Sequence, residues 1–222
     1  MPHVVAQTLR AQIRQEVLDR ILDGRLAPCA PVRHARVARE LDVSVTPLRE
    51  ALIELAREGF LEAHPNRGFA VAPFGADELR DLYDLIGDLE SAALRGGPPS
   101  AARMDVVQAL NRDLADAGGE PWRAVQLDIA WHRELLADAP NEIRRTVLAG
   151  LKTRAVRYAY AYLRDRERIP RSVEQHATVL ARLRDGDMDG AVRALADNWR
   201  PRVMLRWLEE YERRPATSAP VV

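Results

Sequence analysis

Apolar residues in the first third of the chain recur at helical spacing in three short segments. The first segment covers residues 8–22 and ends before Gly24, a residue type that commonly terminates helices. The second runs over about residues 34–41. The third follows Thr46 and Pro47, which suit a helix start because threonine caps helices and proline is tolerated at the first helical position. The pattern predicts three helices.

Two short apolar runs follow these helices and differ from them in period. Residues 60–63 and 68–71 flank a turn-forming stretch, and this arrangement predicts two strands joined as a hairpin. The order of helix, helix, turn, helix and hairpin is typical of a winged helix-turn-helix. We assign that domain to residues 1–74.

From about residue 75 onward the pattern is helical throughout. The first apolar stripe contains Leu79, Leu82, Tyr83, Ile86, Leu89 and Ala93. Further helices are predicted at about residues 101–116, 121–138, 141–166, 172–185 and 187–213. The fold class is therefore mainly α, with the winged helix followed by an all-α bundle over residues 75–214. We expect a disordered tail over residues 215–222.

Composition excludes some classes of protein. The chain is 47% hydrophobic and 30% charged, without an apolar run long enough to span a bilayer or a secretory leader, so we expect a cytoplasmic protein that has no membrane partner. Cys29 is the single cysteine, which excludes an internal disulfide. A redox role for Cys29 stays open beside a role as a small, partly buried turn residue.

Overall charge gives no argument for nucleic-acid binding, because the formal net charge is zero. The argument rests on the third predicted helix, since residues near the start of such a helix reach base edges in the major groove. The residues so placed are Ser44, Val45, Thr46 and Arg49. Arg49 suits a bidentate contact to guanine. The alternative is that Arg49 pairs with Glu50 or Glu54 on a solvated face.

Four short runs in the N-terminal part resemble the DNA-binding domain of the GntR family. They are residues 24–28 (GRLAP), 41–52 (LDVSVTPLREAL), 58–61 (EGFL) and 65–68 (PNRG). The later helices resemble the FadR-type ligand-binding domain of that family, called FCD, and the similarity covers about residues 8–210. The resemblance implies a transcriptional regulator whose recognition helix and wing tip, at Arg67 and Gly68, contact DNA. A tight wing tip also favours positive φ at Gly68.

Val45 departs from the family pattern, which usually has arginine at this position. Valine cannot read guanine, but it can pack on the methyl group of thymine. We therefore expect an operator that differs from the usual one of the family.

The predicted bundle carries candidate metal ligands. Asp128 and His132 are four residues apart and project from one face of a helix. The resemblance implies a divalent-metal site of one aspartate and three histidines, with His176 as the second histidine and Asn198 at the position of the third. Aspartate, two imidazoles and water can still bind zinc, nickel or manganese. The alternative is two buried histidines that bond within the core or to a ligand.

Four side chains on another predicted helix are candidates for contact with an effector: Arg154, Arg157, Tyr158 and Tyr162. The more ordinary interpretation is a solvated arginine face with packed tyrosines.

These features together predict a ligand-responsive regulator that binds a short palindromic operator as a homodimer. Release of a repressor by a small-molecule effector is the usual logic of the family, and activation stays open. One alternative is a metal-dependent hydrolase, although no phosphate-binding loop or nucleophile motif is present, so we expect no enzyme. The other is a winged-helix protein-interaction module without DNA binding.

Overall fold

The computed structural model describes residues 9–22, 24–117, 120–163, 165–200, 202, 204–206 and 208. These residues form two compact units, and the chain passes from the first to the second between Gly75 and Ala76. The predicted tail over residues 215–222 and the end of the last predicted helix lie outside the described residues.

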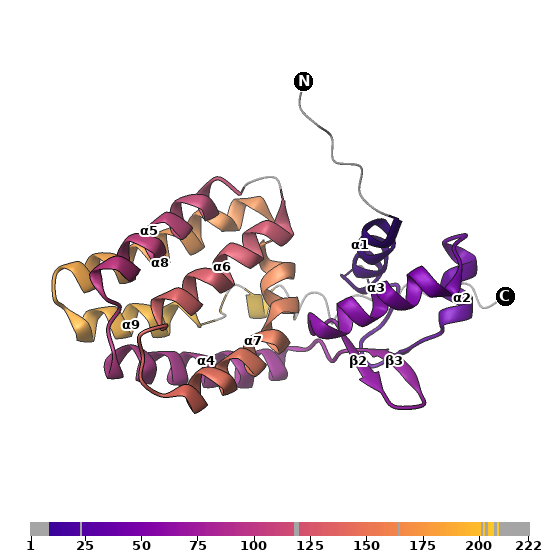
Figure 1. The fold of residues 1–222 in the computed structure, drawn as a ribbon, viewed down its shortest axis with the longest axis horizontal. Helices are drawn as coiled ribbons and strands as arrows, with labels where there is room; N and C mark the ends of the chain where they lie inside the picture. Colours follow the sequence, from indigo (N-terminus) through magenta and orange to yellow (C-terminus); the bar gives the residue numbers. More distant parts are fainter. Residues whose placement is uncertain are drawn as a thin grey trace, which may run out of the picture. The chain divides into compact units, whose positions relative to one another are not determined.

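The N-terminal unit is a winged helix-turn-helix, as the pattern predicts (Figure 1). Its elements are α1 (Leu9–Leu22), β1 (Pro31–Val32), α2 (His34–Glu40), α3 (Val45–Arg57), β2 (Leu61–His64) and β3 (Gly68–Val71). The sequence pattern did not predict β1, because two residues are too few to show an alternation. Pro31 and Val32 pair antiparallel with Ala70 and Phe69, which gives the sheet order β1-β3-β2.

Helix α3 occupies the centre of this unit and packs against α1, α2 and β2. It buries Leu48, Ala51, Leu52 and Leu55 on one face. The expected cap at Thr46 was wrong by two residues, since Ser44 is the N-cap and Val45 the first helical residue. Pro47 is compatible with this start because the amides of the first turn have no partner within the helix.

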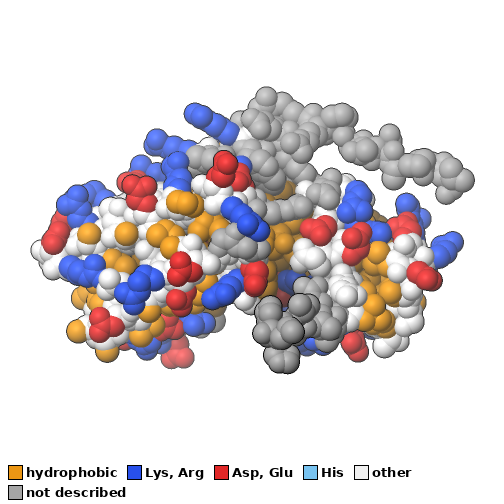
Figure 2. Space-filling view, turned by 90° about the horizontal axis from the view of Figure 1, so that it is seen from above, with side chains coloured by type: hydrophobic (Ala, Val, Ile, Leu, Met, Phe, Trp, Pro, Cys, Tyr) orange, Lys and Arg blue, Asp and Glu red, His pale blue; other side chains and the backbone are white. Residues whose placement is uncertain are grey.

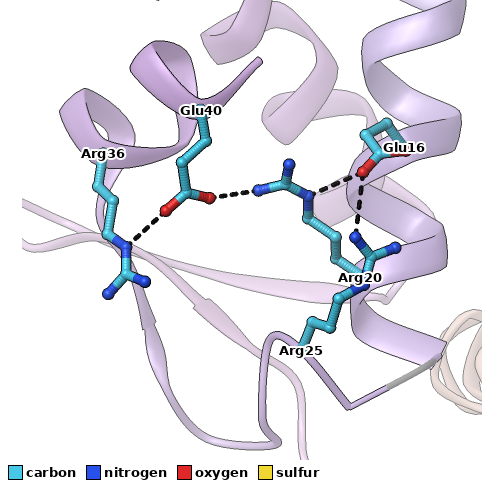
Figure 3. Close-up of polar contacts among 5 residues, drawn as sticks. All are labelled: Glu16, Arg20, Arg25, Arg36 and Glu40. Atoms are coloured by element: carbon cyan, nitrogen blue, oxygen red, sulfur yellow. Dashed lines mark hydrogen bonds and ion pairs between the residues drawn. The ribbon is translucent and has the colours of Figure 1, made fainter. Parts of the chain in front are cut away.

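A chain of ion pairs connects α1 with α2 (Figure 3). Arg20 Nε lies 2.9 Å from Glu16 Oε1, and Arg20 Nη1 lies 2.5 Å from Glu40 Oε2. Arg36 binds the other oxygen of Glu40 at 2.7 Å, and Arg25 reaches Glu16 at 3.4 Å. Three arginines of the N-terminal unit are therefore neutralised by carboxylates of the same unit.

The C-terminal unit is a helical bundle that closes into a ring. Its elements are α4 (Ala76–Gly96), α5 (Ala101–Ala115), α6 (Pro121–Leu135), α7 (Glu142–Leu163), the short turn η1 (Arg166–Arg168), α8 (Ile169–Arg184) and α9 (Met188–Asn198). Contacts between helices run in the order α4, α7, α6, α5, α8, α9 and back to α4 (Figure 1). None of the described helices combines the length and hydropathy that a membrane span requires.

The long final helix predicted over residues 187–213 was wrong. Helix α9 ends at Asn198, and helical conformation is described again only at residues 202, 204–206 and 208. The reason is visible in the sequence, since Pro201 disfavours helical conformation at the residue before it.

Acidic and basic side chains are interspersed on the face of the molecule shown in Figure 2, with apolar side chains between them. This mixing agrees with a net charge of zero.

Candidate functional site

The start of α3 presents the four predicted DNA-contacting residues to solvent. Ser44, Val45, Thr46 and Arg49 are all exposed, Val45 to 48%. The Ser44 hydroxyl makes no capping hydrogen bond. Among the described residues, Arg49 has no ion-pair partner, and Glu54 instead lies 3.7 Å from Arg10. The pairing considered for Arg49 from the sequence is therefore absent from the described residues.

The tip of the β2–β3 hairpin holds the other two predicted contacts. Arg67 is exposed there, and Gly68 has φ of +84°, which confirms the expected positive φ. A Cβ at Gly68 would also lie 3.1 Å from His34 Cε1, so glycine suits this position on two grounds. The tight turn leaves the Arg67 side chain projecting from the hairpin into solvent.

Cys29 lies in the loop before β1 and is exposed rather than partly buried. Its φ is +62°, a left-handed conformation that glycine adopts without strain.

The ring of helices in the C-terminal unit contains a cavity that offers about 80 Å³ to the centres of water-sized molecules. Its polar lining includes Tyr83, Asp128, His132, Lys152, Tyr162, Arg171, Ser172, Gln175 and Asn198. These residues come from α4, α6, α7, α8 and α9, and Ile129, Val156, Leu163 and Met204 add apolar surface. A cavity that combines apolar walls with convergent polar groups suits a small molecule.

Three of the predicted metal ligands lie together, and two of them, Asp128 and His132, line this cavity. The nearest ligand atoms of Asp128, His132 and His176 all lie within 4.8 Å of one another. His176 Nε2 is 3.5 Å from Asp128 Oδ1. Asn198 lines the same cavity, and its amide nitrogen donates to Gln175 Oε1 over 3.4 Å. The structure therefore brings the three titratable ligands together and places Asn198 near them.

Burial controls the protonation of this cluster. Burial lowers the pKa of His176 well below its ordinary value, so its imidazole is neutral and carries a lone pair at neutral pH. Burial also raises the pKa of Asp128, although the nearby His132 and Lys152 act in the opposite direction. A divalent cation favours neutral imidazole and ionised carboxylate. Burial of His176 therefore acts in favour of cation binding, whereas burial opposes the ionised form of Asp128, which a bound cation would restore.

The predicted effector contacts on α7 divide into two groups. Tyr162 lines the cavity. Arg154, Arg157 and Tyr158 do not, and their side chains bind Glu78 at the start of α4. Glu78 receives Arg157 Nη2 at 2.6 Å, Arg154 Nη2 at 2.7 Å and the Tyr158 hydroxyl at 2.7 Å. These three residues connect α4 with α7 instead of facing the cavity.

The sequence analysis missed Glu90, Asn111 and Lys152, all of which lie beside the cluster. Glu90 is fully buried and binds both His132 and Lys152. Two signals could have found this pair. Glu90 continues the buried stripe of α4 four residues after Ile86, where a charge is unexpected. Lys152 is the only lysine in a chain whose other basic residues are arginines, apart from histidine.

The two units match two family models. Residues 9–71 match the bacterial regulatory proteins of the gntR family, and residues 81–200 match the FCD domain. The chain belongs to the GntR family. The predicted resemblance and fold class are thereby confirmed, and the protein is a transcriptional regulator with an FCD effector-binding domain rather than an enzyme. The hydrolase alternative is dropped.

Curated relatives agree with this assignment. The Nta operon transcriptional regulator of Aminobacter aminovorans is 32% identical over 167 residues, which cover 73% of this chain and 77% of the relative. A probable D-xylose utilization operon transcriptional repressor of Paenarthrobacter nicotinovorans is 36% identical over 88 residues, which cover 40% of this chain and 39% of the relative.

Solved structures show the same fold at low sequence identity. Lar, which controls expression of the Listeria monocytogenes agr system, superposes with a TM-score of 0.65 at 17% identity and covers 92% of this chain and 98% of its own. McbR of Escherichia coli superposes with a TM-score of 0.59 at 20% identity, over 93% of this chain and all of its own.

Proposed function

We propose that the protein is a repressor that binds a short palindromic operator as a homodimer and leaves it when a small molecule enters the FCD cavity. Residues 1–74 bind DNA, and residues 75–214 bind the effector and dimerise. The observation that supports DNA binding best is the start of α3, where Val45, Thr46 and Arg49 are exposed and Arg49 has no ion-pair partner among the described residues.

Each exposed group at this helix end suits a different part of DNA. The Ser44 and Thr46 hydroxyls and the free amides of the first turn suit phosphate oxygens. Arg49 lies one turn further and suits the O6 and N7 atoms of guanine. Arg67 and the backbone at Gly68 suit phosphate or the minor groove beside the wing. The paired Arg20, Arg25 and Arg36 are excluded from this set because carboxylates already bind them.

The effector site is the cavity of the C-terminal unit, with Tyr162 among its contacts. Asp128, His132 and His176 would hold one divalent cation, which is zinc, nickel or manganese by ligand type, and Asn198 would add at most a carbonyl oxygen. The cation, when bound, supplies a positive centre for an oxygen of the effector. The fit is supported by the buried His176 Nε2, which has no hydrogen-bond partner among the described residues.

Repression is supported by the name of one relative, the probable D-xylose utilization operon repressor. Effector release requires that the effector binds the free dimer more tightly than the DNA-bound dimer.

The DNA assignment is tested with Arg49→Ala against the matched control Arg57→Ala, which removes an exposed arginine from the other end of α3. We expect Arg49→Ala to weaken binding to the selected operator by about 1–3 kcal/mol, and so by about fivefold or more, because a bidentate guanine contact is lost. Arg57→Ala should change the affinity for the same operator less than threefold. The measurement is fluorescence anisotropy on an operator obtained by selection from random DNA.

The salt dependence of binding separates this function from the protein-interaction alternative. Specific DNA binding should weaken steeply between low and moderate salt, because counterions are released from the phosphates. Failure to select any operator, or equal operator affinity of Arg49→Ala and wild type, would contradict the proposal for α3.

A further inference from the structure

The two histidines of the cavity cluster are each held through Nδ1 by a residue of another helix. His132 Nδ1 lies 2.8 Å from Glu90 Oε2 on α4, and His176 Nδ1 lies 3.2 Å from Asn111 Oδ1 on α5. Both contacts are buried, and neither Glu90 nor Asn111 lines the cavity. The same ring nitrogen is thus occupied in both imidazoles, and the other nitrogen, Nε2, is left for a further contact.

The surroundings of Glu90 determine what its carboxylate does. It is 0% exposed, and the indole Nε1 of Trp199 donates to Oε2 at 2.6 Å, while the Lys152 ammonium pairs with Oε1. Indole and ammonium are donors only. A carboxylate surrounded by donors is an acceptor, so Nδ1 of His132 carries the hydrogen in this contact.

Hydrogen bonds also fix the orientation of the Asn111 side-chain amide. Its Nδ2 donates to the backbone carbonyl of Val173 at 3.0 Å, which leaves Oδ1 to accept from His176 Nδ1. The ring of Trp131 stacks on His176 with centroids 3.7 Å apart and planes 3° from parallel, so the imidazole cannot rotate freely. His176 Nε2 is then an acceptor that points to the side of Asp128, 3.5 Å from Oδ1.

We propose that Glu90 and Asn111 are positioning residues for a divalent cation, each holding one histidine with Nε2 directed toward Asp128. The inference rests on the proposed cation site. Partners of this kind fix the tautomer and ring direction of a ligand and commonly change metal affinity by about 10–100-fold when mutated. Imidazoles that are already oriented before the cation binds would allow Asp128, His132 and His176 to hold it, although Asn198 stands at the position of the third histidine.

The test measures Zn²⁺ and Co²⁺ affinity of the full chain by competition with a chromophoric chelator. Glu90→Gln and Asn111→Ala should each weaken binding about tenfold or more. The Co²⁺ absorption spectrum should also shift in both variants, because the imidazoles change orientation. A purely structural role would leave this spectrum unchanged.

Glu134→Gln is the matched control, because it makes the same carboxylate-to-amide change in a residue of α6 that pairs with Arg103 of α5 and does not line the cavity. It should keep the affinity within threefold of wild type. Should Glu90→Gln fail to fold, Asn111→Ala carries the test with the same thresholds.

The outcomes separate the two proposals. Absence of Zn²⁺ and Co²⁺ binding in the wild type overturns the cation site and the positioning role together. Binding that Asp128→Asn abolishes, combined with near wild-type affinity and spectra in the folded positioning variants, overturns the role of Glu90 and Asn111 alone.

Discussion

Val45 is the residue at which the proposed recognition helix departs from the pattern that its family resemblance implies. It is the first residue of α3 and is 48% exposed, beside Thr46. An apolar side chain exposed at this point gains nothing from the protein core. Its suitable contact on DNA is the C5-methyl group of thymine, which lies in the major groove.

Replacement of thymine by uracil tests this contact, because uracil lacks only that methyl group. We expect the wild type to lose about 0.8 kcal/mol, or about fourfold in affinity, when the contacted thymine is replaced. The Val45→Ala variant should lose clearly less binding free energy when the same thymine is replaced by uracil. Fluorescence anisotropy of both proteins on both operators gives this double-mutant cycle. An equal loss in both proteins would show that Val45 does not make the contact.

At the level of elements, Glu78 joins the first turn of α4 to α7. Its carboxylate receives Arg154, Arg157 and the Tyr158 hydroxyl, and Arg157 is itself buried. Burial would raise the pKa of Glu78, but the hydrogen bonds of Arg157, Tyr158 and Arg154 outweigh it and lower the pKa below 4.5. Because α4 directly follows the N-terminal unit in the chain and α7 lines the cavity, this contact ties the pocket wall to the start of the domain.

Glu78→Gln should destabilise the C-terminal unit by about 2 kcal/mol at pH 7, since charged hydrogen bonds in a partly buried site are lost. The pKa of Glu78 is lower in the folded state, so its contribution is present above the unfolded value and is lost as pH falls through the folded value. The difference in free energy of unfolding between wild type and Glu78→Gln should therefore become smaller below about pH 4.5.

Urea unfolding followed by tryptophan fluorescence measures this difference, because every tryptophan follows residue 76 in the sequence. Asp77→Asn is the control, since Asp77 is a neighbouring exposed carboxylate that pairs with Arg80 of the same helix. A difference between wild type and Glu78→Gln that does not change with pH would contradict the ion-pair explanation.

At the level of the whole molecule, the proposed homodimer needs a self-complementary surface. The exposed large apolar side chains of the described C-terminal unit are Leu85 on α4, Val106 on α5, and Ile143 and Val147 on α7. Three of them lie on α4 and α7, which pack against each other. Ile143 is 79% exposed, which is unfavourable unless another surface covers it.

The double variant Ile143→Asp with Val147→Asp should convert the dimer to a monomer and lower operator affinity at least tenfold, because only a dimer presents two recognition helices together. Light scattering after size-exclusion chromatography measures the mass. Val106→Asp, at an equally exposed valine of α5, should leave the dimer intact. A double variant that stays dimeric would place the interface elsewhere.

The common exposure of the proposed DNA-contacting residues of α3 was predictable because these residues are close in sequence. Ser44 to Arg49 fall on one helix start, and helical geometry alone decides which of them share a face. The cap was misplaced because Ser44 and Thr46 are both good capping residues and Pro47 tolerates either start.

The cavity was predictable only in part. The four-residue spacing of Asp128 and His132 placed both on one face of α6, whereas the pairing with His176 came from family resemblance. Nothing in the spacing related Arg154, Arg157 and Tyr158 to Glu78, which lies on a different helix.

The sequence by itself determined the winged helix and the bundle, because local periodicity, caps and turn residues act over a few positions. The family followed from the resemblance of short contiguous runs to known motifs. The tertiary structure alone decided which helices adjoin in the ring, and therefore that Glu90 binds His132 and that Asn111 binds His176. These contacts join residues 42 and 65 positions apart, and their formation depends on how apolar faces pack.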